Sequence, residues 1–185
     1  MAIEPNAAGD YPEVDPSARV HETAAIIGNV TIGARVFVGP QATVRADEPG
    51  PDGTVAPITI GEESNVQDGV VIHSLGGARV QIGVGTSIAH GAVVHGPCEI
   101  GRDSFIGFNT VVYDATLGER VVVMHGACIE SVQVAEGLYV PSTAAVRSSE
   151  DVSGLEPASQ EARDFAKKVR QTNTHLATAN PDRPS

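Results

Sequence analysis

The stretch that decides the fold is residues 82–112, "IGVGTSIAHGAVVHGPCEIGRDSFIGFNTVV", in which an aliphatic residue stands at every sixth position. Glycine often follows that residue, and a small or β-branched residue comes four positions after it. This period is typical of a parallel β-helix, in which each hexapeptide supplies one short strand and a turn. Three hexapeptides then complete one triangular coil of about 18 residues.

The same period extends to both sides of this stretch. The further aliphatic positions are Val20, Ile26, Ile32, Val38, Val44, Ile60, Val66 and Ile72 before it, and Leu117, Val123 and Ile129 after a five-residue step. The period is interrupted at residues 45–60 and 73–82, where we expect loops to project. The aliphatic side chains point into the prism, so we predict a mainly β protein with a core of small and β-branched residues.

The repeat ends after Val146, and a helix is predicted beyond it. Apolar residues recur there at helical spacing, at Ala162, Phe165, Val169 and Leu176, and Pro157 suits a first helical turn. We therefore divide the chain into an N-terminal extension (1–13), a β-helix domain (14–154), a C-terminal helix (155–178) and a flexible tail (179–185).

Composition and charge exclude several classes of function. The 12 Lys and Arg against 23 Asp and Glu give a net charge of −11, which opposes a nucleic-acid partner. We see no secretory signal and no apolar run near the roughly 20 residues of a membrane span, so we expect a cytoplasmic protein without a membrane partner. The two cysteines, Cys98 and Cys128, are interpreted as small buried residues rather than a disulfide framework.

Two histidines, His90 and His95, lie five residues apart in an apolar run, a spacing that fits neither one helix face nor one strand face. If each loop replaces a turn without adding a strand, Arg45, His73 and His95 follow stacked aliphatic residues and form a column. His73 and His95 then lie close enough for both rings to bind one metal ion at about 2.0–2.1 Å.

His90 belongs to the preceding face of the coil. It shares a column there with Asp68, Phe108 and His125, and it cannot easily turn the corner to meet His73 and His95. A neighbouring subunit can supply it, so three imidazoles converge at an interface between subunits. The spacing therefore predicts a homotrimer with one metal site at each interface. His125, two coils on, is interpreted as an interface residue, and Phe108 as lining the entrance.

Four runs in this sequence closely resemble the gamma-class carbonic anhydrases, including the gamma-type domain of carboxysomal proteins. The runs are "VRADE" (44–48), "SNVQDGVVIH" (64–73), "SIAHGAVVHGP" (87–97) and "FIGF" (105–108). The resemblance covers about residues 14–178. It implies a left-handed β-helix, a C-terminal helix and a homotrimer, with His73 and His95 of one subunit and His90 of the next as metal ligands.

The resemblance also implies reversible hydration of CO2 to bicarbonate by a metal-bound hydroxide. Three neutral imidazoles suit Zn2+, and Fe2+ or Co2+ would suit the same ligands. The residues that the resemblance places around the metal are Gln67, as a hydrogen-bond partner of the hydroxide, Glu48, in proton removal or bicarbonate binding, and Asn173, near the substrate. A helix hydrogen bond is the alternative role for Asn173. Arg45 and Asp68, joined by Asp47, are expected to form an ion pair between subunits.

One departure from the family pattern leaves other functions open. The segment "HSLGGARVQIG" (73–83) is short, and Gly76 stands where prototype members carry a proton-transferring Glu. The segment "DEPGPDGTVAP" (47–57) is instead longer than its usual counterpart. The alternatives are a relative with little hydratase activity that acts as an acyl-CoA thioesterase or as a structural or assembly subunit. Three converging histidines argue against a hexapeptide acyltransferase, which typically relies on a single catalytic histidine.

Overall fold

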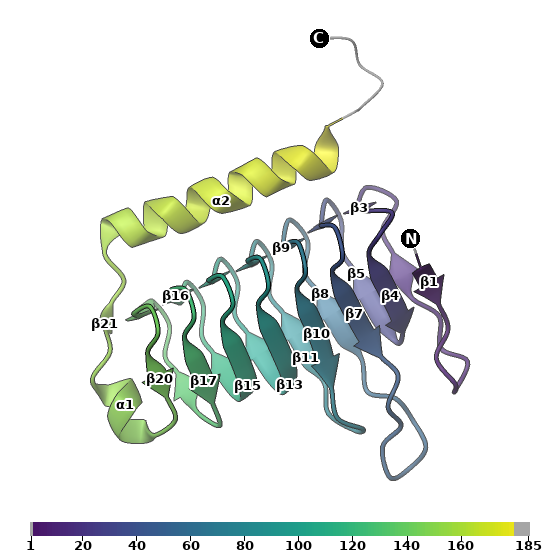
Figure 1. The fold of residues 1–185 in the computed structure, drawn as a ribbon, viewed down its shortest axis with the longest axis horizontal. Coiled ribbons are helices and arrows are strands. Elements are labelled where there is room, and N and C mark those ends of the chain that lie inside the picture. Colours follow the sequence, from purple (N-terminus) through teal and green to yellow (C-terminus); the bar gives the residue numbers. More distant parts are fainter. Residues whose placement is uncertain (1, 180–185) are drawn as a thin grey trace.

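Short parallel strands stack coil upon coil along the axis of the molecule, as the six-residue period predicts (Figure 1). The structure is a computed structural model that describes residues 2–179. Its fold is mainly β, a left-handed parallel β-helix followed by a C-terminal helix. The predicted flexible tail, 179–185, lies outside the described residues apart from Ala179.

Two faces of the prism belong to one sheet of 13 strands, because β13 and β15 continue around the corner between them. Face 1 consists of β1 (Ala2–Glu4), β4 (Ala25–Gly28), β7 (Thr43–Ala46), β10 (Val71–Ser74), the first halves of β13 (Val93–Ile100) and β15 (Val111–Leu117), β17 (Cys128–Glu130) and β20 (Ala145–Val146). Face 2 consists of β2 (Glu13–Val14), β5 (Val30–Ile32), β8 (Ile58–Ile60), β11 (Val80–Ile82), the second halves of β13 and β15, and β18 (Gln133–Val134).

Face 3 is a separate sheet of eight strands. Its members are β3 (Arg19–Val20), β6 (Phe37–Val38), β9 (Asn65–Val66), β12 (Ser87–Ile88), β14 (Phe105–Ile106), β16 (Val122–Val123), β19 (Leu138–Val140) and β21 (Glu156–Pro157). All pairs are parallel except the last, in which β21 runs antiparallel to β19.

The predicted aliphatic positions form the core of the prism. Ile26, Ile72, Ile88 and Ile106 have no exposed surface, and the other predicted positions are buried as well, except Val20 in the first coil, which is half-buried. Burial of a side chain of this size contributes about 1.5–3 kcal/mol. The six-residue period therefore predicts the core correctly from the sequence alone.

Small polar residues satisfy the backbone at the corner between faces 2 and 3. The Ser64 hydroxyl donates to the Gly83 carbonyl at 2.8 Å, and that of Thr86 donates to the Gly101 carbonyl at 2.8 Å. The same hydroxyl oxygens accept the N–H groups of Thr86 (3.0 Å) and Ser104 (3.2 Å) in the following coils. A buried turn needs such partners, which explains the small polar residues at these positions.

The first residues of the chain join the coils. Residues 2–4, which the sequence analysis assigns to an N-terminal extension, form β1, and Ile3 pairs with Ile26 of β4. The six-residue period gives no sign of this strand, because the residues between β1 and β2 do not follow it.

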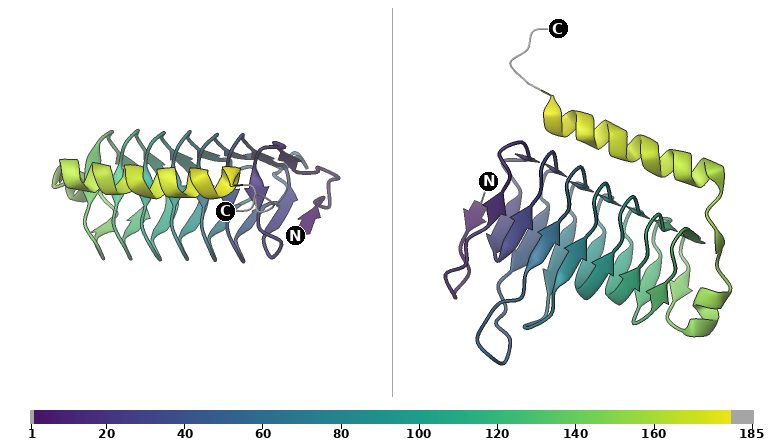
Figure 2. Two further views of the ribbon diagram at one scale, coloured as in Figure 1. Left: turned by 90° about the horizontal axis from the view of Figure 1, so that it is seen from above. Right: turned by 180° about the vertical axis from the view of Figure 1, so that it is seen from behind.

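The C-terminal helix α2 (Gln160–Thr178) runs back along face 3 and contacts β3, β6, β9, β12 and β16 (Figure 2). It begins at Gln160 rather than at residue 155, because Pro157 pairs in β21 and the Ser159 hydroxyl caps the helix by accepting the Ala162 N–H at 3.1 Å. Placing Pro157 in the first helical turn was therefore wrong. A short helix, α1 (Ser149–Ser153), precedes β21.

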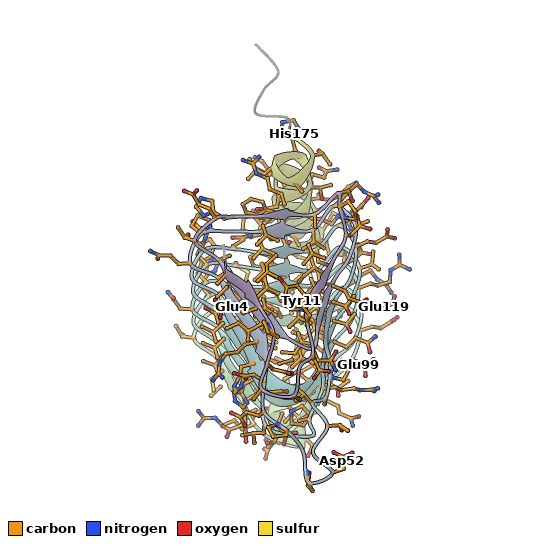
Figure 3. All side chains as sticks on the ribbon, turned by 90° about the vertical axis from the view of Figure 1, so that its right-hand side faces the viewer. Glu4, Tyr11, Asp52, Glu99, Glu119 and His175 are labelled. Carbon is orange, nitrogen blue, oxygen red and sulfur yellow. The ribbon has the colours of Figure 1, made fainter. Side chains whose placement is uncertain are left out.

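Loops interrupt the coils at both places that the sequence predicts, and both lie at the corner between faces 1 and 2. Seen along the stack, this corner lies opposite α2, and Asp52 marks the tip of the 47–57 loop beyond it (Figure 3). The loop is closed by a bridge between Pro49 and Val55, and Asn29 donates to the Val55 carbonyl at 2.7 Å. Between Ala2 and Ala179, no helix is long and apolar enough to cross a membrane.

Candidate metal centre

His73 and His95 are neighbours on adjacent coils of face 1. β10 pairs with β13 so that His73 lies opposite His95, and it pairs with β7 so that His73 lies opposite Arg45. The column predicted from the sequence is therefore present. The Nδ1 atom of His73 faces the Nε2 atom of His95 at 3.3 Å, and the ring centroids are 5.1 Å apart.

These two nitrogens are spaced as ligands of one metal ion would be. Two nitrogens that each lie about 2.05 Å from a tetrahedral zinc are about 3.3 Å apart. Burial lowers the pKa of His73, and the Arg45 cation lowers it further, whereas Glu48 and Asp47 act in the opposite direction. His73 is therefore neutral at pH 7 and can offer a lone pair to a metal.

Two carboxylates lie on the other side of the His73 ring. Its Nε2 atom is 3.3 Å from Asp47 Oδ1 and 3.4 Å from Glu48 Oε1, and it is buried. Neither contact has hydrogen-bond geometry, so this Nε2 has no hydrogen-bond partner among residues 2–179. The His73 ring thus contacts His95 through its Nδ1 atom, whereas its Nε2 atom faces the two carboxylates without a hydrogen bond to either.

Arg45 anchors Asp47 within the same chain. Its Nη1 atom donates to both carboxylate oxygens of Asp47, at 2.9 and 2.6 Å. Asp68, the expected partner of Arg45 across the interface, lies at a different corner of the same chain. The pairing of Arg45 with Asp68 of a neighbouring subunit stays a prediction.

His90 lies at the corner between faces 3 and 1, after β12. Its side chain is 52% exposed, and its Nδ1 atom is 3.7 Å from Asp68 Oδ1, too far for a hydrogen bond. Within the chain, this corner is separated from His73 and His95 by the width of face 1. Among residues 2–179, no three His, Cys, Asp or Glu side chains are grouped so that they could hold a metal.

Gln67 comes from the same corner as His90, and a buried chain of hydrogen bonds orients it. Its Nε2 atom donates to Asn65 Oδ1 at 2.9 Å, and Asn65 Nδ2 donates to Ser87 Oγ at 2.8 Å. All three residues are at most 3% exposed. Because the Gln67 amide nitrogen is committed to Asn65, its Oε1 atom points the other way.

Asn65 and Ser87 were not among the site residues predicted from the sequence. Their positions could have indicated them. Asn65 lies two residues before Gln67, on the same side of the strand, and Ser87 pairs with Asn65 in the next coil. Asn173 is buried on α2, as the helical stripe predicts, and its Nδ2 atom donates to the Val169 carbonyl at 3.0 Å. This is the helix hydrogen bond that the sequence analysis kept as an alternative to a role near the substrate.

The site residues thus form two groups on one chain. The first half-site, at the corner of faces 1 and 2, contains His73, His95, Arg45, Asp47 and Glu48. The second half-site, at the corner of faces 3 and 1, contains His90, Gln67 and Asp68.

The two loops beside the first half-site pack against each other. A Cβ atom at Gly76 would lie 2.2 Å from the Pro49 carbonyl oxygen, and one at Gly50 would lie 3.0 Å from Gly77 Cα. The 47–57 loop therefore occupies the space where a side chain at position 76 would begin. A proton-transferring acid cannot be accommodated at Gly76 unless this loop moves.

Comparison with known proteins identifies the family. A carbonic anhydrase from Methanosarcina thermophila is 34% identical over 190 residues, which cover 90% of this chain and 73% of that protein. The chain belongs to the gamma-class carbonic anhydrase family. A scan against protein-family models finds no match.

Other relatives are similar to this chain over part of their length. Carboxysome assembly protein CcmM from Nostoc sp. is 39% identical over 194 residues, which cover 95% of this chain and 34% of that protein. The chain thus spans about a third of the length of this relative. Carnitine operon protein CaiE from Escherichia coli is 38% identical over 116 residues, 62% of this chain and 55% of that protein.

Solved structures share the architecture. A hexapeptide transferase family protein from Anaplasma phagocytophilum superposes with a TM-score of 0.77 at 25% identity, covering 95% of this chain and 96% of that one. This likeness supports the coil and the C-terminal helix of this chain. It does not distinguish among the activities that such coils carry.

Proposed function

We propose that this protein is a homotrimeric metalloenzyme that hydrates CO2 to bicarbonate, with one metal site at each subunit interface. The observation that carries the proposal is the pair of facing ring nitrogens of His73 and His95, whose 3.3 Å separation suits two zinc ligands. His90 lies at another corner of the chain and points to solvent, so a neighbouring subunit is needed to complete three imidazoles. Fe2+ and Co2+ fit the same ligand set.

Each half-site has a distinct task in this proposal. His73 and His95 of one subunit and His90 of its neighbour would hold the zinc, which would supply hydroxide at neutral pH by lowering the pKa of water to about 7. Gln67, fixed by Asn65, presents its Oε1 atom as a hydrogen-bond acceptor that orients the attacking oxygen. Gln67 acts from the subunit that supplies His90.

The carboxylates act from the subunit that supplies His73 and His95. Glu48 is 44% exposed, so it can accept a proton at the site and exchange it with solvent. Asp47 is held by Arg45 and is assigned to keeping the loop in place rather than to proton transfer. Asn173 donates to the Val169 carbonyl of its own helix, and its contact with the substrate stays a prediction.

A second function is favoured by a specific observation. The similarity to an assembly protein, CcmM, is at least as strong as the similarity to a carbonic anhydrase, at 39% against 34% identity. A chain that binds metal and forms trimers but does not hydrate CO2 would serve assembly or the alternative raised from the sequence, acyl-CoA hydrolysis. Assays of CO2 hydration and acyl-CoA hydrolysis on the same metal-loaded trimer separate these functions.

Subunit mixing tests where the ligands come from. His90→Ala and His95→Ala subunits each lack one ligand, so neither homotrimer should hold metal tightly or turn over. In refolded mixtures, an interface that joins His95 of one variant to His90 of the other is complete. Equal mixing should restore about a quarter of the sites.

Metal content and CO2 hydration are both measured in the mixture. If neither metal content nor CO2 hydration recovers in the mixture, the proposed interface site is refuted. Recovery of metal without hydration would support the interface and favour the assembly function. A mixture of His73→Ala and His95→Ala is the matched control, because both ligands belong to the same half-site and no interface in it is complete.

A further inference from the structure

A stack of aromatic rings lies beside His90 at the corner between faces 3 and 1. The Phe108 ring is tilted against the His90 ring with centroids 5.4 Å apart. On its other side, Phe108 stacks on His125 with centroids 4.3 Å apart and planes 9° from parallel. The three rings come from successive coils, whose backbones are joined by hydrogen bonds from Asn109 N to His90 O at 3.0 Å and from Gly126 N to Phe108 O at 2.8 Å.

His125 holds Phe108 by a second contact. The His125 Nδ1 atom accepts the backbone N–H of Phe108 at 3.0 Å. A nitrogen that accepts carries no hydrogen, so this contact fixes the neutral ring as the Nε2–H tautomer. Behind it, the buried ring of Phe105 meets His125 edge-on at 6.3 Å, so the stack rests on the interior of the protein.

His90 itself has little else to hold its ring. Its side chain is half exposed, and the nearest charged group, Asp68, is beyond hydrogen-bond distance. An exposed ring that rotates freely loses conformational entropy when it is fixed by a ligand or partner. Contact with Phe108 reduces that loss, because the ring is already restricted on one side.

We propose that Phe108 and His125 are positioning residues for His90, holding its ring so that it projects toward the metal site of the neighbouring subunit. Phe108 supplies the surface against which His90 rests, and His125 fixes Phe108 through the stack and the backbone N–H. This inference rests on the proposed function, in which His90 is a metal ligand. Neither residue contacts the reacting atoms.

The test measures zinc affinity in purified trimers by competition with a chromophoric chelator. Phe108→Leu removes the ring that contacts His90, and His125→Leu removes both the stack and the acceptor. Residues that orient a ligating histidine typically change metal affinity by 10–100-fold, and we expect losses in that range. Phe108→Tyr keeps the ring and should stay within about threefold of the wild type. The Co2+ absorption spectrum of the two leucine variants should change as well, because the ligand geometry changes.

Phe165→Leu is the matched control. Phe165 is as exposed as Phe108, at 39%, and its ring contacts Phe105 rather than His90 or Phe108. Its replacement should leave zinc affinity and the Co2+ spectrum unchanged. If Phe108→Leu dissociates the trimer, His125→Leu decides the matter, because His125 lies behind Phe108 and does not touch the His90 ring.

The outcomes separate this inference from the proposed function. Wild-type trimers that bind zinc, together with leucine variants that bind it equally well and give the same Co2+ spectrum, would overturn the positioning role alone. Wild-type trimers that bind no zinc would overturn both. If Phe165→Leu lowers zinc affinity as much as Phe108→Leu and His125→Leu do, the losses reflect general packing against α2. This result would also overturn the proposal.

Discussion

Replacing Gly76 by alanine tests whether the turn after β10 holds the acid-bearing loop in its position. The added Cβ atom would lie 2.2 Å from the Pro49 carbonyl oxygen and 2.9 Å from the carbonyl carbon. These are backbone atoms, so no side-chain rotation relieves the clash. The 47–57 loop must therefore retreat by about 1 Å to restore an ordinary contact.

Movement of the 47–57 loop displaces the carboxylates of the first half-site, because Asp47 and Glu48 directly precede Pro49. Their oxygens lie 3.3 and 3.4 Å from His73 Nε2. A displacement of about 1 Å at a site of this kind can lower turnover by about 100-fold. Overpacking typically costs about 1–3 kcal/mol, which a β-helix with this core should survive.

Gly77→Ala is the control for local strain. Gly77 has φ +80°, but its Cβ would meet only ordinary contacts, at 3.6 Å or more. This variant should lose about 1–2 kcal/mol of stability without moving the loop. CO2 hydration is measured for both variants, with hydrogen exchange of residues 49–55 as a readout that needs neither metal nor activity. Unchanged loop protection and turnover in Gly76→Ala, or equal losses in Gly77→Ala, would refute the reasoning.

Four further predictions concern the contacts around the site and the two cysteines. Arg45→Ala should weaken the trimer more than Gln67→Ala does in sedimentation experiments, whereas Gln67→Ala should lower turnover in trimers that still bind metal; equal effects on both quantities would contradict these assignments. Asn65→Leu should lower turnover by about tenfold with metal content retained, because Gln67 loses its fixed orientation, and wild-type kinetics would show that another contact orients it. Burial raises the pKa of the Cys98 thiol, so the folded state holds its proton to higher pH than the unfolded state does. The contribution of Cys98 to the free energy of unfolding should therefore be constant up to about pH 8.5 and then fall, and Cys98→Ala should remove that part of the slope. Alkylation of the native protein should reach Cys128, which is half-buried, before Cys98.

The coil could be predicted from the sequence because its periodicity is local. An aliphatic residue at every sixth position is enough to place Ile72 and Val94 on one face, and their register then brings His73 beside His95. What the period could not predict were contacts between segments that do not follow it. β1 joins face 1, and Pro157 pairs with β19 instead of starting a helix, because partners elsewhere in the chain satisfy their backbone groups.

The site could be predicted only in part, for a similar physical reason. Columns of residues follow from the repeat, so Arg45, His73 and His95 could be grouped from sequence, as could His90 and Asp68. The parts of Glu48 and Gln67 in the two half-sites came instead from the family resemblance. The packing of Gly76 against Pro49 depends on loop conformations, which no periodicity determines. The hydrogen-bond chain from Gln67 to Ser87 depends on side-chain orientation across two coils. Phe165 and Leu176, which the helical spacing placed on the buried stripe, are 39% and 41% exposed, because spacing alone does not show how far a helix covers the sheet below it.

The path of α2 along face 3 has a consequence for how the molecule unfolds. A stack of coils is nearly one-dimensional, since each coil touches only its neighbours, and such arrays can fray from their ends in independent steps. In this protein, one helix touches strands from the first coil, through β3, to a late one, through β16. Separating the end coils from the stack therefore also requires separating them from the helix. The helix thus couples the unfolding of early and late coils, which favours a single cooperative unfolding transition over gradual loss from the ends.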